Sequence, residues 1–98
     1  MPPAPRIELA QRAVRDLRKM DAGGRRRVQA GLKDLAEGAD NLDVKALAGS
    51  APWRRLRVGE WRVLYRPLSR QESRGGGLLV ARVIDRRELE RAVRSLQT

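Results

Sequence analysis

Arginine side chains are concentrated in one short segment of the chain, residues 53–67, which reads WRRLRVGEWRVLYRP. Five of its fifteen residues are arginine. A guanidinium group is a permanent cation whose planar set of donors suits the paired oxygens of a phosphate. Like charges that face each other across a sheet are unfavourable, so such a set is better explained if a polyanion supplies the countercharge. The alternative is a solvated face of long side chains lying over a sheet.

The overall composition also favours a polyanionic partner. The 98 residues include 22 Lys and Arg but only 12 Asp and Glu, a net charge of +10, which is typical of nucleic-acid binding. There is no histidine and no cysteine. This removes thiol chemistry, disulfides, the commonest general base and the commonest metal ligands. We therefore expect neither a cofactor nor a metal.

The chain shows no sign of a membrane segment. Its uncharged runs are far shorter than the ~20 apolar residues that span a bilayer. The first residues, MPPAPR, lack the apolar centre of a signal peptide. A cytoplasmic protein without a membrane partner is expected.

A tight turn at Gly59-Glu60 is expected to divide the arginine-rich segment into two strands. A two-residue loop with glycine fixes the register, so that Val58 pairs with Trp61 and Arg57 with Arg62. Because side chains alternate along a strand, the hairpin has two different faces. The apolar face would carry Leu56, Val58, Trp61, Val63 and Tyr65, and the basic face Arg55, Arg57, Arg62, Leu64 and Arg66. The first face is expected to pack against helices and the second to meet phosphates.

Two helices are predicted before the hairpin. Apolar residues recur at steps of three and four from Ala10 to Met20. Asp21 can cap a second helix that continues to about Glu37, where Gly38 stops it. The short connection predicts an antiparallel helical hairpin. Residues 38–52 form a loop in which VKAL, residues 44–47, is expected to make a short turn of helix.

A flexible connection, a third strand and a last helix are predicted after the hairpin. LSRQESRGGG, residues 68–77, is the connection, and LLVARVI, residues 78–84, is the strand. Asp85 and Glu88 have the spacing of a capping box. The helix after them, RRELERAVRSL, would turn Leu89, Val93 and Leu96 inward.

This order predicts an α+β fold. Two N-terminal helices in a hairpin pack on a small, twisted antiparallel sheet, and a C-terminal helix completes the chain. The sheet is a three-strand meander, and RIEL, residues 6–9, is compatible with a fourth, N-terminal edge strand. All helices are expected on one face of the sheet. We expect a single domain over residues 1–98, with residues 1–5 as a flexible lead-in.

The quoted segments resemble a known family. WRRLRVGEWRVLY resembles the central hairpin of the RelE/ParE superfamily of toxins from bacterial type II toxin–antitoxin pairs. AVRDLRKM, residues 13–20, is similar to that family's first helix, and KALAG, residues 45–49, to the stretch before its hairpin. VIDRRELER, residues 83–91, is similar to its last strand and the residues just after that strand. The resemblance spans roughly residues 7–91. The core from Arg55 to Tyr65 is fairly specific for the superfamily but does not separate its two branches.

The resemblance implies one of two activities. A RelE-like toxin enters the ribosomal A site and cuts the bound mRNA, whereas a ParE-like toxin inhibits DNA gyrase and is not a nuclease. We expect the RelE-like activity, an mRNA endoribonuclease that depends on the ribosome and inhibits translation. A gyrase inhibitor and a plain basic nucleic-acid-binding module are the alternatives.

RelE-like cleavage uses the RNA 2′-hydroxyl as nucleophile, and the resemblance assigns roles by position. Arg62 matches the family's arginine after the hairpin turn and Arg86 the one after the last strand, so both would hold the scissile phosphate. Arg55 matches a basic residue on the preceding strand. The catalytic set is then Arg62, Arg86 and Arg55, and the residues expected to bind RNA are Arg57, Arg66, Arg82, Arg87, Lys45 and Trp53.

Two positions depart from the family pattern. Trp53 stands where a further basic residue is usual, and it could stack on a base or cover the sheet edge. Glu90 stands where many members carry a tyrosine. The general base is unassigned, with Glu90 a candidate by position and a surface ion pair its alternative role.

The resemblance also implies the partners. These are the ribosome, its mRNA and a cognate antitoxin. The antitoxin would be an acidic, amphipathic segment that lies over the basic face or displaces the last helix, residues 86–96.

Overall fold

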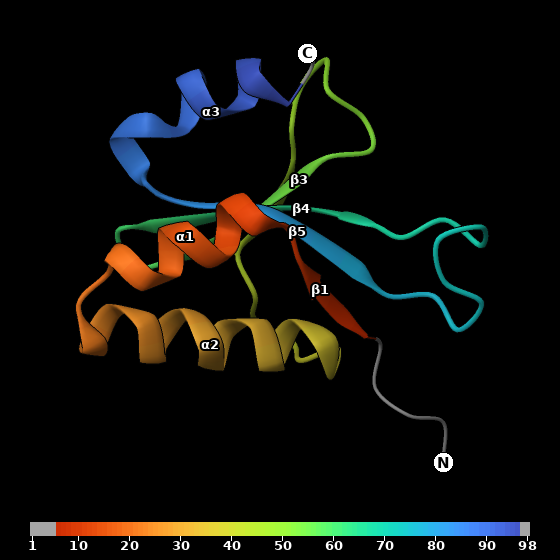
Figure 1. Ribbon diagram of the computed structural model, residues 1–98, viewed down its shortest axis with the longest axis horizontal. Helices are drawn as coiled ribbons and strands as arrows, with labels where there is room; N and C mark the ends of the chain where they lie inside the picture. The colour runs from red at the N-terminus through yellow and green to blue at the C-terminus, as the bar shows by residue number, and fades with distance from the viewer. Residues whose placement is uncertain (1–5, 97–98) are drawn as a thin grey trace.

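The computed structural model describes residues 6–96 as one sheet with helices on both of its faces (Figure 1). The predicted lead-in, residues 1–5, lies outside the described residues. The elements occur in the order β1 (Ile7–Leu9), α1 (Gln11–Lys19), α2 (Ala22–Ala36), β2 (Val44–Ala46), β3 (Arg54–Val58), β4 (Trp61–Pro67), β5 (Leu78–Asp85), the 3₁₀ helix η1 (Arg86–Glu88) and α3 (Leu89–Ser95). The predicted α+β class with two N-terminal helices and a C-terminal helix is confirmed.

The sheet has five strands in the order β1-β5-β4-β3-β2. The predicted hairpin register is confirmed, with Val58 opposite Trp61 and Arg57 opposite Arg62. Gly59 in the turn has a φ of +58°, a conformation that favours glycine. Residues 6–9 do contribute an edge strand, but β1 runs parallel to β5, so the sheet is mixed rather than antiparallel throughout.

The prediction of a helical turn at residues 44–47 is wrong. Val44–Ala46 form strand β2, which pairs antiparallel with β3 so that Lys45 lies opposite Arg55. Four residues are too few to show a period, and the partner strand decides the conformation of so short a segment.

The helical hairpin forms as its end signals predict. The Asp21 side chain accepts a hydrogen bond of 3.2 Å from the Gly24 amide at the start of α2. Gly38 comes after the helix with a φ of +69°, as expected for a residue that ends a helix. α1 and α2 then cover one face of the sheet with a core that includes Leu17, Val28, Leu56, Val63, Tyr65 and Val80.

The helices do not all lie on one face, which corrects a second expectation. α3 packs on the opposite face (Figure 1), over Leu64 and Ile84. Leu64 is fully buried there although its strand neighbours on that face are arginines. Its inward-facing partners on α3 are Leu89, Val93 and Leu96, as predicted, together with buried Ala92. α3 therefore divides the basic face into a covered part and an open part.

None of the helices within residues 6–96 combines the length and the apolar character needed to cross a membrane.

Candidate nucleic-acid interface

Four arginines, Arg55, Arg57, Arg62 and Arg86, form what we call the arginine cluster. Two of them, Arg57 and Arg62, lie directly opposite each other on β3 and β4. Arg86 joins them because its backbone amide donates a 2.9 Å hydrogen bond to the carbonyl of Glu60 in the hairpin turn. The cluster thus occupies the turn end of the hairpin, where β5 leaves the sheet.

Arg62 lies at the centre of the cluster. Its Nη1 atom donates hydrogen bonds to the backbone carbonyls of Gly59, at 2.9 Å, and Trp61, at 3.0 Å. Partial burial lowers the pKa of Arg62 from its usual value, and the positive charges of the other three arginines lower it further. Among the carboxylates of residues 6–96, none forms an ion pair with Arg62. A cation that is held in place by carbonyls and surrounded by other cations has the charge and the donors that an anion needs.

The other three arginines do contact carboxylates. Arg55 Nη1 lies 3.0 Å from Asp43 Oδ1, and Arg57 Nη1 lies 3.8 Å from Asp43 Oδ2. The hydrogen bond from Arg55 lowers the pKa of Asp43. Arg86 Nε lies 2.8 Å from Glu60 Oε2, and these two side chains are 60% and 66% exposed. An exposed pair of this kind is worth little, so a phosphate can displace the Glu60 carboxylate from Arg86.

Sequence reasoning missed both carboxylates, Asp43 and Glu60. The signal for Asp43 is the short strand β2. Once Val44 is placed opposite Leu56, Asp43 falls beside Arg57, whose amide donates to the Asp43 carbonyl at 2.9 Å. The signal for Glu60 is its place in the two-residue turn, next to the first residue of β4.

The residues predicted to bind RNA are distributed around the cluster. Lys45 is exposed on the edge strand β2. Arg66 forms two hydrogen bonds with Glu72, of 2.7 and 2.8 Å. Its guanidinium carbon also lies 5.7 Å from the centre of the Trp53 ring, within the range of a cation–π contact. Arg87 is paired at 3.0 Å with Asp85.

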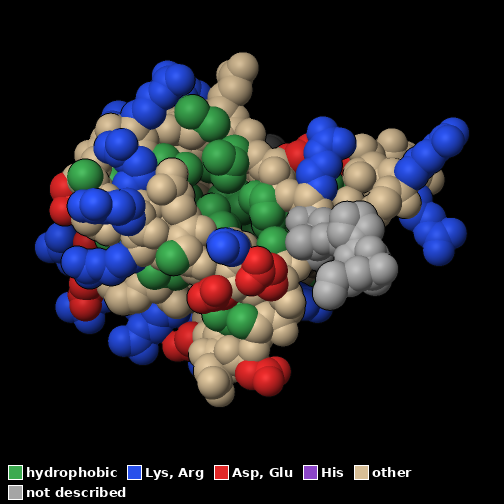
Figure 2. Space-filling view, turned by 90° about the horizontal axis from the view of Figure 1, so that it is seen from below, with side chains coloured by type: hydrophobic (Ala, Val, Ile, Leu, Met, Phe, Trp, Pro, Cys, Tyr) green, Lys and Arg blue, Asp and Glu red, His purple; other side chains and the backbone are tan. Residues whose placement is uncertain are grey.

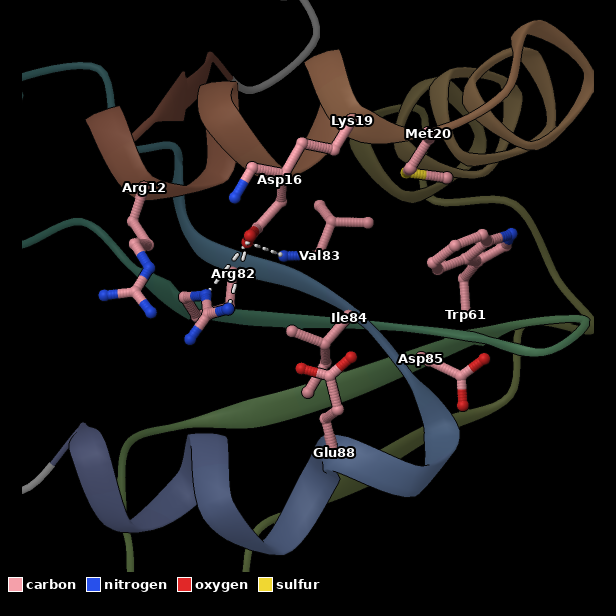
Figure 3. A pocket seen from close by; sticks show the side chains of 10 residues that line it. All are labelled: Arg12, Asp16, Lys19, Met20, Trp61, Arg82, Val83, Ile84, Asp85 and Glu88. Carbon is pink, nitrogen blue, oxygen red and sulfur yellow. Dashed lines mark hydrogen bonds and ion pairs between the residues drawn. The ribbon is translucent and has the colours of Figure 1, made fainter.

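Arg82 takes part in a different arrangement. It donates to Asp16 on α1 from Nε at 2.9 Å and from Nη2 at 3.2 Å, and the Val83 amide donates to the same carboxylate at 2.9 Å (Figure 3). These residues line a hollow of about 390 Å³ between α1, the end of β5 and η1. Asp16 therefore closes the sheet edge that β1 leaves uncovered.

Glu90 lies on the α3 side of the sheet. It lines a mainly apolar groove with Leu47, Ala48, Leu89, Val93 and Arg94. The charges that act on Arg62 come instead from the other cluster arginines and from Glu60. Within the part of the chain that the structure describes, no group of three or more acidic residues could hold a metal ion.

Comparison with known proteins identifies the family. Residues 7–90 match the sequence profile described as the ParE toxin of type II toxin–antitoxin system, parDE. The chain belongs to this family. The resemblance to RelE/ParE superfamily toxins is thereby confirmed, and the toxin is a component of a type II toxin–antitoxin system.

Two solved structures share the fold of this toxin. The RelB–RelE antitoxin–toxin complex of Methanococcus jannaschii matches with a TM-score of 0.67 and 19% identity, over 87% of this chain and 96% of the other. The archaeal RelE–RelB complex of Pyrococcus horikoshii OT3 matches with a TM-score of 0.63 and 20% identity, over 85% of this chain and 96% of the other. At these identities the likeness concerns the fold alone. A comparison with curated proteins gave no match.

Proposed function

We propose that this toxin is a ribosome-dependent endoribonuclease that cuts mRNA and so inhibits translation. The observation that carries the proposal is the unneutralised Arg62 at the centre of the arginine cluster. Cytoplasmic action on the ribosome and its mRNA is part of the proposal.

The proposed reaction is attack by a ribose 2′-oxygen on the adjacent phosphorus. The bond from phosphorus to the 5′-oxygen breaks, and the departing 5′-oxygen takes up a proton from water, which leaves a 2′,3′-cyclic phosphate and a 5′-hydroxyl. Negative charge builds up on the phosphate oxygens in the transition state. Arg62 and Arg86 are assigned to hold these oxygens, and Arg55 and Arg57 to hold the neighbouring backbone. Because the sheet and the turn carbonyls already position Arg62, little reorganisation is needed when this charge forms.

Glu60 is assigned as the acceptor of the 2′-hydroxyl proton. Its carboxylate lies beside Arg86 at 2.8 Å and acts electrostatically on Arg62. Asp43 is the poorer base, since the bond from Arg55 lowers its pKa. Glu90, the sequence-based candidate, lines the groove beneath α3 instead. A substrate phosphate that binds Arg86 would release the Glu60 carboxylate to take the proton.

The test is translation in vitro with the purified toxin, with subsequent mapping of the mRNA ends. Wild type should produce new ends within the reading frame. Arg62→Ala should slow cleavage by about 10²- to 10³-fold, the usual loss for one charge-stabilising donor. Arg27→Ala, an exposed arginine on α2, is the matched control and should cleave normally. Intact mRNA and normal translation with wild-type toxin would exclude this function.

A cognate antitoxin is the proposed natural partner. Both structural neighbours are complexes of an antitoxin with a toxin. The net charge of +10 favours an acidic antitoxin segment over the open part of the basic face.

Inhibition of DNA gyrase is the second candidate function. The match to the ParE toxin profile favours it, as do Trp53 and Glu90, which stand where RelE-like toxins usually carry a basic residue and a tyrosine. A gyrase supercoiling assay separates the two candidates. Inhibited supercoiling with intact mRNA would establish the second candidate and exclude the first.

A further inference from the structure

The connection between β4 and β5, residues 68–77, forms an arm that projects from the sheet away from α1, α2 and α3 (Figure 1). Its composition predicts a flexible connection, but the arm contains a defined turn. Glu72 Oε1 accepts from Arg66 Nη1 at 2.7 Å and from the Ser69 amide at 3.0 Å. The Glu72 amide in turn donates to Ser69 Oγ at 3.2 Å. The bonds from Arg66 and Ser69 lower the pKa of Glu72 to about 2.

The second half of the arm is also held by hydrogen bonds. The Ser73 amide donates to the Ser69 carbonyl at 2.9 Å, and the Ser73 hydroxyl donates to the Gly76 carbonyl at 2.8 Å. The Leu68 amide closes the base of the arm on the Gly77 carbonyl at 2.8 Å. The backbone of the arm is therefore held in a defined conformation.

Two arginines of the arm, Arg70 and Arg74, are exposed. Neither forms an ion pair with a carboxylate of residues 6–96. The only acidic residue of the arm, Glu72, is already bound to Arg66 of β4. Figure 2 shows basic side chains at the far end of this projection. The arm thus offers positive charge with no local countercharge.

Strand β4 joins the arm to the arginine cluster. From Arg62 to Pro67 the strand advances by five residues, roughly 17 Å at ~3.3 Å per residue. A stacked nucleic acid strand, with one phosphate every ~3.4 Å, covers this in about five nucleotides. One RNA strand can therefore reach both places, whereas a short oligonucleotide cannot.

We propose that the arm is a second RNA-binding element, in which Arg70 and Arg74 contact backbone phosphates about five or more nucleotides from the cluster. The choice of RNA as the polyanion rests on the proposed function. The contact is to phosphates, so the arm adds affinity and orientation without selecting a sequence.

The experiment measures binding of the full-length toxin to two free RNAs, a trinucleotide and a strand of about 15 nucleotides, long enough to span the ~17 Å with phosphates ~3.4 Å apart. The variant is Arg70→Gln with Arg74→Gln. The matched control is Arg26→Gln with Arg27→Gln, which removes the same charge from exposed positions on α2. Circular dichroism checks that all proteins are folded.

The arm variant should bind the longer RNA about 10- to 30-fold more weakly at ~0.1 M salt, because each phosphate contact contributes about 0.7 to the slope of log K against log salt. That slope should fall by about 1.4. The control should change neither quantity appreciably, and trinucleotide binding should be the same for all proteins.

If the arm variant and the control lose equal RNA affinity, or if the arm variant also binds the trinucleotide more weakly, net charge alone would explain the loss of affinity. Either result would overturn the proposal. The same binding assay is run with single-stranded DNA and with a polyglutamate peptide. If the arm variant loses affinity only for one of these, the proposal is overturned in favour of another partner. The proposed function is tested separately. If wild type leaves ribosomal mRNA intact but the arm variant still loses RNA binding, the nuclease assignment fails and the arm assignment stands.

Discussion

Replacing Asp16 by alanine is expected to destabilise the toxin by about 3 kcal/mol. The carboxylate accepts two hydrogen bonds from Arg82 and one from the Val83 amide, of 2.9, 3.2 and 2.9 Å. The Asp16 and Arg82 side chains are only 13% and 14% exposed. Removing one partner of a buried pair costs roughly 3–5 kcal/mol, because the other charge is left without a partner. Since both side chains keep some contact with water, the lower end of this range applies.

Urea denaturation monitored by circular dichroism measures this change. A loss of about 3 kcal/mol should also lower the melting temperature by roughly 12–24 °C in a domain of this size. Asp34→Ala removes an exposed carboxylate on α2 and should stay within about 0.5 kcal/mol of wild type. A loss below about 1 kcal/mol for Asp16→Ala would refute the reasoning, because it would mean that water replaces the carboxylate.

A double variant of the Asp16–Arg82 pair tests whether Arg82 contacts RNA. The double variant Asp16→Leu with Arg82→Leu should be more stable than Asp16→Ala, because neither charge is then buried alone. If Arg82 acts mainly on Asp16, the double variant should also keep the salt dependence of RNA binding. A slope reduced by about 0.7 would instead assign a phosphate contact to Arg82.

Three further outcomes are expected from the structure. The Glu72 carboxyl should titrate by NMR with a midpoint near 2. Its contribution to stability is therefore complete above its usual pKa of 4.5 and is lost as the pH falls through about 2. Arg66→Met should move the midpoint up towards 4.5. Leu64→Ala should cost roughly 2–5 kcal/mol in urea denaturation, because this side chain is 0% exposed, and a change below about 1 kcal/mol would show that α3 does not depend on it. Gly77→Ala should cost at least roughly 1–3 kcal/mol in the same assay, since Gly77 has a φ of +137° and a Cβ there would lie 2.5 Å from the Arg6 carbonyl oxygen.

Local signals were sufficient for much of the fold. The Gly59 turn fixes the hairpin register, Asp21 and Gly38 mark the ends of α2, and apolar periodicity identifies the inner face of α3. Each of these depends on residues close together in sequence, where propensity and capping act. The arginine cluster could be predicted for the same reason, because three of its four members lie on one hairpin.

Contacts between residues far apart in the sequence could not be predicted in this way. The side of the sheet on which α3 packs is signalled only by Leu64 and Ile84, two apolar residues on a face that otherwise carries arginines. The carboxylates that pair with the arginines were harder still to predict. Asp16 and Arg82 lie 66 residues apart, and the contact between Asp43 and Arg55 depends on a strand of only three residues. Hydrophobic patterns carry no information about which acid meets which base.

Both edges of the sheet are formed by strands of only three residues, β1 and β2. Each edge strand also carries a charged side chain at its centre, Glu8 in one and Lys45 in the other. Short, charged edges offer another chain few backbone groups to pair with. More than a quarter of the chain lies in strands, yet the short edge strands disfavour pairing of one folded copy with another through their sheet edges.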